Sequence, residues 1–263
     1  METAHSKSPA PPHAIRIGTA GWTLPKQHAQ HFPEAGTHLE RCAQGLNCVE
    51  VNSSFHRPHQ RKTWERWARC TPPDFRFAVK LPKGITHIAQ LANCGAPLHK
   101  FFEEVRGLSD KFGPILVQLP PRLAFDEALA NDFFTTLREL HPQSLHTGFI
   151  ALEPRHASWF APPVDRLLRG FEIARVAADP PKGSPLAATP GGWSGLCYWR
   201  LHGTPRTYYS SYNTGFLRRF ATQLRKAPCG EQWVIFDNTA LGHATANALD
   251  LMDLLQQRCR LGR

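Results

Sequence analysis

Short runs of apolar and β-branched residues recur along the chain, and longer segments of mixed polarity separate them. Most of these runs are apolar at nearly every position, which is typical of strands buried on both faces of a sheet. Eight runs predict strands, at residues 15–18, 48–52, 75–80, 115–119, 148–152, 173–178, 196–201 and 232–236.

Helical patterns lie between the predicted strands. Apolar residues recur at spacings of three and four, which predicts amphipathic helices, within residues 98–108, 129–140, 216–224 and 251–255. Trp64 and Trp67 lie one turn apart in a further helix predicted at residues 60–70, and Asp126 is a candidate N-cap. Residues 180–195 are rich in glycine and proline, and we predict a long loop there.

Eight strands alternating with helices over roughly 250 residues are typical of a (β/α)8 barrel. The alternative is an open doubly wound sheet, which usually carries a glycine-rich phosphate loop after its first strand. Gly18, Gly21 and Trp22 follow the first strand here, but neither G-x-G-x-x-G nor G-x-x-x-x-G-K-[ST] occurs. We therefore predict an α/β fold of the TIM-barrel class with a long loop after strand six. It forms a single domain at 15–263, after a disordered, proline-rich tail at 1–14.

Composition narrows the class of protein. With 31 Lys and Arg against 21 Asp and Glu, the formal net charge is +10, and 41% of residues are hydrophobic, which is ordinary for a globular chain. No apolar stretch is long enough to cross a membrane, and the first residues lack a secretory signal, so no membrane contact is expected. Seven scattered cysteines without a C-x-x-C motif predict reduced thiols in a cytoplasmic protein and no structural zinc.

Polar or ionisable residues stand at the carboxyl end of nearly every predicted strand. A barrel brings these ends together around one mouth, so the pattern predicts a polar cavity at its C-terminal face. The residues concerned are Glu50, Asn52, Lys80, Gln118, Glu153, Arg155, Asp179, Arg200, His202, Asp237 and Asn238.

The residue types at these positions suggest an acid/base site for an anion. Lys80, Arg155 and Arg200 are predicted to bind and polarise a phosphate or carboxylate, since guanidinium groups match both anions. Glu153 or Asp179 is the candidate general base, and His202 is the candidate proton carrier because its ordinary pKa lies near neutrality. An alternative stays open, in which Glu50 and Glu153 only form structural ion pairs with Arg155 or Arg200.

Several of these residues lie in motifs that occur together in a known family. The motifs are IGTAGW (17–22), VEVNSSF (49–55), FRFAVK (75–80), ITH (85–87), GPILVQLPP (113–121), LEPRH (152–156), RLHG (200–203) and FDNT (236–239). In this order they resemble the YecE-like family, the domain of unknown function 72, over residues 15–255. The resemblance implies a TIM barrel and leaves the activity unassigned.

The resemblance also adds residues to the candidate site. It points to Thr86 and His87 as further pattern positions. The candidate substrate-binding residues, besides Arg155 and Arg200, are Glu50, Asn52, Gln118, Asn238, His87 and Trp22, which ends the first motif. Two positions depart from the family pattern. Asp237 stands where the family often has an asparagine, which adds a carboxylate to the mouth, and Phe55 stands where a tyrosine is usual, which removes a possible proton donor.

We therefore expect an enzyme, of the hydrolase, isomerase or lyase type, that acts on an anionic small molecule. A divalent metal held by Glu50, Glu153, Asp179 and His202 is a less favoured alternative, because no compact metal motif is present. A second alternative is nucleic-acid binding through Lys62, Arg66 and Arg69, which form one stripe on the helix predicted at 60–70, here called the basic stripe. A metal-dependent phosphodiesterase or endonuclease-like enzyme would combine the two.

Overall fold

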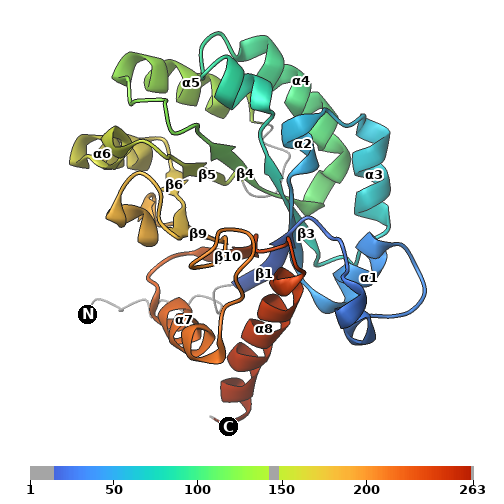
Figure 1. The fold of residues 1–263 in the computed structure, drawn as a ribbon. Coiled ribbons are helices and arrows are strands. Elements are labelled where there is room, and N and C mark those ends of the chain that lie inside the picture. The colour runs from blue at the N-terminus through green and yellow to red at the C-terminus, as the bar shows by residue number, and fades with distance from the viewer. Residues whose placement is uncertain (1–14, 142–147, 262–263) are drawn as a thin grey trace, which may run out of the picture.

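Parallel strands form the wall of a barrel, and helices lie around its outside (Figure 1). The structure is a computed structural model that describes residues 15–141 and 148–261, so the predicted tail lies outside the described residues. The order of pairing along the sheet is β7-β9-β10-β1-β2-β3-β4-β5-β6-β8. The wall strands are β1 (Ile15–Ala20), β2 (Cys48–Val51), β3 (Arg76–Lys80), β4 (Phe112–Gln118), β5 (Ile150–Glu153), β6 (Ile173–Arg175), β7 (Ala177–Asp179), β9 (Leu196–Leu201) and β10 (Glu231–Phe236).

The barrel closes through the segment predicted as the sixth strand. This segment is two short strands rather than one, because β6 pairs with β5 and β7 pairs with β9. Only Val176 separates the two strands, and its N–H donates to the Leu152 carbonyl at 2.9 Å. One continuous piece of chain therefore joins the two ends of the parallel sheet, and the TIM-barrel prediction is confirmed.

Most predicted helices begin and end near the predicted positions, but the last helix, predicted within 251–255, spans His243–Leu261. Asp126 caps α5, as predicted, by accepting a hydrogen bond from the Leu129 N–H at 2.8 Å. The apolar pattern at 98–108 becomes α4 followed by a 3-10 turn. Three short helices, α1, α2 and α6, were not predicted because each offers few apolar positions. The α-helices are α1 (His38–Gly45), α2 (Ser53–His56), α3 (Arg61–Arg69), α4 (Gly95–Val105), α5 (Glu127–Leu140), α6 (Pro162–Gly170), α7 (Thr214–Lys226) and α8 (His243–Leu261).

Alternation along the strands separates an inner from an outer core. Small and aromatic side chains such as Ala78, Ala151, Tyr198 and Trp233 form a cluster inside the barrel. A second and larger cluster contains the residues between them, which pack against the helices. On β9, for example, the Trp199 ring packs edge-on against Phe220 of α7 at a centroid distance of 5.1 Å. Whether a residue at a strand end points inward or outward therefore decides whether its side chain can reach the mouth of the barrel.

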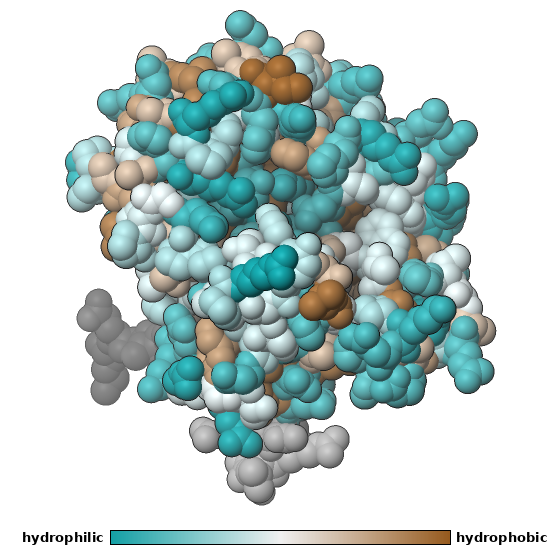
Figure 2. Space-filling model, in the orientation of Figure 1, coloured by the Kyte–Doolittle hydropathy of each residue, from teal (hydrophilic) through white to brown (hydrophobic). Residues whose placement is uncertain are grey.

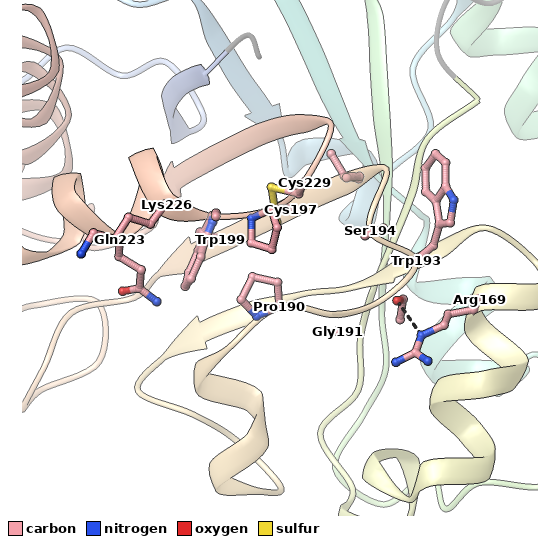
Figure 3. A pocket seen from close by; sticks show the side chains of 14 residues that line it. Arg169, Pro190, Gly191, Trp193, Ser194, Cys197, Trp199, Gln223, Lys226 and Cys229 are labelled. Carbon is pink, nitrogen blue, oxygen red and sulfur yellow. Dashed lines mark hydrogen bonds between the residues drawn. A yellow bond between two sulfur atoms is a disulfide. The ribbon is translucent and has the colours of Figure 1, made fainter. Parts of the chain in front are cut away.

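The segment after β7 has no α-helix. Residues 180–195 hold only a 3-10 turn (Pro185–Ala188) and β8 (Gly191–Gly192), which pairs antiparallel with β6 and was not predicted. A cavity of about 480 Å³ therefore opens between α6 and α7 on the outer wall. Figure 3 shows Arg169 of α6 on one side of this cavity, and Gln223 and Lys226 of α7 on the other.

The cysteine prediction needs correction at this cavity. Cys197 and Cys229 form a disulfide in its wall, with their Cα atoms 6.0 Å apart (Figure 3). They are 32 residues apart in sequence. The parallel pairing of β9 with β10 brings the start of β9 beside the residues that precede β10, a proximity that cysteine spacing alone does not reveal. Cys42, Cys48, Cys70 and Cys94 are free thiols.

None of the helices in the described residues combines the length and hydropathy needed to cross a membrane.

Candidate active site

A buried arginine organises the carboxyl ends of the strands. Arg200 on β9 is 1% exposed, and its guanidinium donates to both oxygens of Glu50 at 3.0 and 2.7 Å. The same group donates to Glu153 Oε2 at 2.7 Å and to Asp237 Oδ2 at 3.3 Å. Three acids from three separate strand ends therefore share one cation in the centre of the barrel.

Further donors complete the coordination of the carboxylates. The Tyr198 hydroxyl donates to Glu50 at 2.9 Å, and Gln118 donates to Glu153 at 3.0 Å. Arg155 adds two hydrogen bonds to the other oxygen of Glu153, at 3.0 and 2.8 Å. Both carboxylates are thus held by ion pairs and hydrogen bonds, as the structural alternative from the sequence proposed.

The charges of this cluster are strongly coupled. Burial alone would raise the pKa of Glu153, but Arg200 and then Arg155 hold it well below its ordinary value. Burial would likewise raise the pKa of Asp237, and Arg200 and His202 lower it. Burial disfavours the charged form of Arg200, but Glu50, Glu153 and Asp237 outweigh it and raise its pKa. Glu153, Asp237 and Arg200 are therefore ionised near neutral pH.

Lys80 stands beside this network without joining it. It ends β3, is 8% exposed, and has its ammonium 4.1 Å from the centre of the Phe55 ring. No described residue accepts a hydrogen bond from its Nζ or forms an ion pair with it within 4.0 Å. Burial, and then the charge of Arg200, lower the pKa of Lys80 to about 8.

A cavity of about 470 Å³ opens over Lys80 at the mouth of the barrel. Its lining is mostly basic or polar, and Asp237 is its single acidic member among the described residues. The face of the molecule seen in Figure 2 is largely hydrophilic, with only isolated hydrophobic residues. The lining residues are Asn52, Phe55, His56, Lys80, Lys83, His87, Gln118, Arg200, Tyr208 and Asp237.

His202 lies beneath this cavity rather than in its wall. Its Nδ1 is 2.8 Å from Asp237 Oδ2, and its Nε2 is 3.9 Å from Glu153 Oε1. Nε2 is buried and has no hydrogen-bond partner among the described residues. Tyr208 lies edge-on to the His202 ring at 5.9 Å, and the left-handed backbone of Tyr208 (φ 72°) holds it there. The side chain of His202 therefore does not line the cavity, and it lies at hydrogen-bond distance from a lining residue, Asp237.

The structure brings together most of the residues predicted from the sequence. Of those not yet placed, Asn52 and His87 line the cavity, and Asn52 Oδ1 is buried without a partner among the described residues. His87 is close to Thr86, with Nδ1 2.8 Å from its hydroxyl. Burial, and then the charge of Lys80, lower the pKa of His87, so its ring is neutral near pH 7.

Three predicted residues lie apart from the cavity. Asp179 pairs in register with Leu201, which faces outward, and its carboxylate accepts hydrogen bonds from Thr204 and Tyr212, both at 2.7 Å. Asn238 is one residue beyond the inward-facing Asp237 and donates to Ser210 and Asn247. Trp22 packs edge-on against Trp67 at 4.9 Å. The side chains of Asp179, Asn238 and Trp22 do not line the cavity.

Sequence reasoning missed several residues of the mouth. Tyr198 lies two residues before Arg200 on the same face of β9, a relation that alternation could have revealed. Lys83, His56 and Tyr208 come from loops and a short helix after the strands, where no periodic pattern predicts direction.

The proposed metal ligands do not form a metal site. Arg200 donates to both oxygens of Glu50 and to one oxygen of Glu153, and Asp179 faces the other side of the wall. Within the described ranges, no group of three His, Cys, Asp or Glu side chains is arranged to hold a metal ion. The basic stripe is exposed on α3, with Trp64 buried behind it.

The fold and the cluster at its mouth define a protein of the TIM-barrel class. The family model described as "Protein of unknown function DUF72" matches residues 16–261, so the chain belongs to this family. It is 30% identical to the UPF0759 protein YecE of Escherichia coli K12 over 144 residues, so the match spans about half of each protein. It is 25% identical to the UPF0759 protein YunF of Bacillus subtilis, over 92% of this chain and 94% of YunF.

Solved structures share the fold. A DUF72 family protein from Thermotoga maritima superposes with a TM-score of 0.74 at 23% identity, over 93% of this chain and all of that chain. One from Enterococcus faecalis gives 0.76 at 21% identity, over 92% and 96%. An L-ribulose 3-epimerase also matches, with a TM-score of 0.51 and 13% identity over 95% and 99% of the two chains, which indicates a shared barrel alone.

Proposed function

We propose that this protein is an enzyme that acts by general acid/base chemistry on an anionic small molecule bound in the mouth of the barrel. The observation that carries the proposal is the buried ammonium of Lys80, which faces the cavity and has no acidic partner within ion-pair distance among the described residues. A buried cation without a partner is unfavourable, and a bound phosphate or carboxylate would supply that partner.

The surroundings of Lys80 support an anion in particular. The buried network contains two arginines, Arg200 and Arg155, and three acids, Glu50, Glu153 and Asp237, so its formal charge is −1. Lys80 and Lys83 line the cavity and bring the formal charge of the mouth to +1. A cavity of about 470 Å³ falls in the range of small-molecule sites.

Proton transfer is better assigned to Asp237 than to Glu153 or Asp179. Both oxygens of Glu153 are occupied by arginine and glutamine donors, which makes it a weak base. Asp237 lies in the cavity wall and contacts His202, which can relay a proton to or from it. His87, a neutral imidazole in the same wall, is a second candidate base.

Anion binding can be tested without knowing the substrate. Titration calorimetry with inorganic phosphate should detect binding to the wild type, and Lys80→Met should weaken it about tenfold or more, since a charge-assisted hydrogen bond contributes about 1.5–3 kcal/mol. Lys100→Met, on the exposed surface of α4, is the matched control and should bind phosphate like the wild type. Equal affinity in all three proteins would contradict the proposed site.

The acid/base assignment needs a turnover assay. Phosphorylated and carboxylated metabolites can be screened for conversion, and Asp237→Asn should then lower kcat by about a hundredfold or more. Glu153→Gln is a less direct probe, because it also breaks the network around Arg200. Full turnover by a folded Asp237→Asn variant would remove Asp237 from the mechanism.

A further inference from the structure

Two lysines of this chain are equally buried, and they differ in what surrounds the amine. Lys80 and Lys111 are both 8% exposed. Lys111 Nζ donates to the carbonyls of Ala68 and Thr71 at 2.6 and 2.5 Å and to the Thr71 hydroxyl at 3.1 Å. Its three donor positions are therefore filled, as expected of a structural lysine.

Lys80 has none of these acceptors. Its Nζ contacts an aromatic face at 4.1 Å and opens on the mouth cavity, and no described residue accepts a hydrogen bond from it. An amine kept free of hydrogen bonds and ion pairs, at the end of a rigid strand, retains its lone pair for reaction once the proton leaves. We infer that Lys80 is a nucleophile that forms an imine with the carbonyl group of an anionic aldehyde or ketone, an inference that rests on the proposed function.

The protonation state of Lys80 supports this role. Because its pKa is lowered to about 8, roughly a quarter of the amine is neutral near pH 7.5, against about one part in a thousand for an ordinary lysine. The lowering is caused first by burial and then by the neighbouring Arg200 cation. These are the two conditions that activate lysine as a nucleophile in proteins.

The remaining groups of the cavity fit the steps of imine formation. The neutral amine attacks the carbonyl carbon, a C–N bond forms, and the carbonyl oxygen takes up a proton, giving a carbinolamine. The nitrogen then loses its proton, the hydroxyl is protonated and leaves as water, and a C=N bond results. Asp237 and His87 both line the cavity and can carry these protons.

The anionic part of the substrate would be held at the rim. Lys83 and His87 line both the mouth cavity and an adjacent hollow bounded by Pro120, Pro121 and Arg122. Lys83 and Arg122 therefore extend the positive surface outward from Lys80. A molecule could therefore place its carbonyl group at Lys80 and its phosphate or carboxylate beside the positive charges of Lys83 and Arg122.

Reductive trapping distinguishes a nucleophile from a simple anion ligand. The 263-residue chain is incubated with pyridoxal 5′-phosphate and cyanoborohydride, and the modified lysines are identified by peptide mass spectrometry. Lys80 should be modified about tenfold or more faster than the exposed Lys100, because its amine is neutral to a far greater extent. Pyridoxal without the phosphate should react more slowly, and inorganic phosphate should protect Lys80.

Lys80→Arg provides the matched variant, since it keeps the positive charge and cannot form an imine. It should still bind phosphate in the calorimeter while losing the trapped product at this position. Phosphate binding by the wild type without selective trapping at Lys80 would overturn the nucleophile and leave the anion site standing. Failure of both measurements would overturn the proposed function as well.

Discussion

The replacement Arg200→Met tests how the barrel mouth is held together. Methionine fills a similar volume and removes the cation that neutralises Glu50, Glu153 and Asp237. Breaking one partner from a buried ion pair costs about 3–5 kcal/mol, because the remaining charge stays buried without compensation. Arg200 pairs with three acids and is only 1% exposed, so we expect the loss of stability to lie in the upper part of this range. Such a loss is a large share of the roughly 5–15 kcal/mol by which a typical domain is stable.

The loss should depend on pH, and its sign follows from the pKa shifts. In the wild type the pKa values of Glu153 and Asp237 are lowered, so their contribution to stability is present above their unfolded pKa values and is lost as the pH falls through the folded ones. Without Arg200 the largest charge that opposes burial is gone, so the pKa values of both acids rise relative to the wild type, although Arg155 still contacts Glu153 and His202 still contacts Asp237. The variant then protonates these acids at a higher pH than the wild type does, and its stability deficit should shrink as the pH falls from about 7 to about 5.

Urea denaturation followed by tryptophan fluorescence measures this difference directly. The control is Arg106→Met, which removes a surface pair with Glu103 whose side chains are 44% and 46% exposed and should cost at most about 0.5 kcal/mol. A loss below about 1 kcal/mol for Arg200→Met, or the same loss at both pH values, would refute the view that uncompensated carboxylates dominate the effect.

Three further predictions concern separate parts of the molecule. Asp126→Ala should lower the free energy of unfolding by about 1 kcal/mol through loss of the α5 cap, whereas Asp126→Asn should keep most of it; equal losses would exclude capping as the cause. Cys197→Ser should destabilise the oxidised protein by about 3 kcal/mol and have little effect after reduction, whereas a loss that persists in reductant would be a packing effect. Charge reversal of the basic stripe should abolish any salt-dependent affinity for duplex DNA or RNA measured by fluorescence anisotropy, and unchanged affinity would place that binding elsewhere.

The periodicity of the sequence predicted the barrel because each strand is a short apolar run that local patterns reveal. It did not predict the division between β6 and β7, because pairing with two different neighbours is a property of closure and not of the segment itself. The disulfide was missed for the same reason, since only the pairing of β9 with β10 brings Cys197 near Cys229.

The prediction placed residues at the mouth correctly where they both stand at the carboxyl end of a strand and point into the barrel. Glu50, Lys80 and Arg200 occupy inward positions, and all three meet at the mouth. Asp179 and Asn238 also stand at strand ends, but they occupy positions whose side chains point outward. Their side chains therefore form hydrogen bonds outside the barrel. Knowledge of the register of each strand would have separated the two groups, and the apolar runs alone do not supply it.

The division of one strand at Val176 affects how easily the barrel opens locally. The contacts that complete the cylinder are ladders of only three residues each, on β6 and on β7, whereas β9 and β10 share six. Helix α6 packs against β6 on the outside, but the segment after β7 contributes no α-helix to this seam and crosses with a single 3-10 turn and a two-residue strand. We expect the amide protons of β6 and β7 to exchange with solvent earlier than those of the six-residue ladder between β9 and β10.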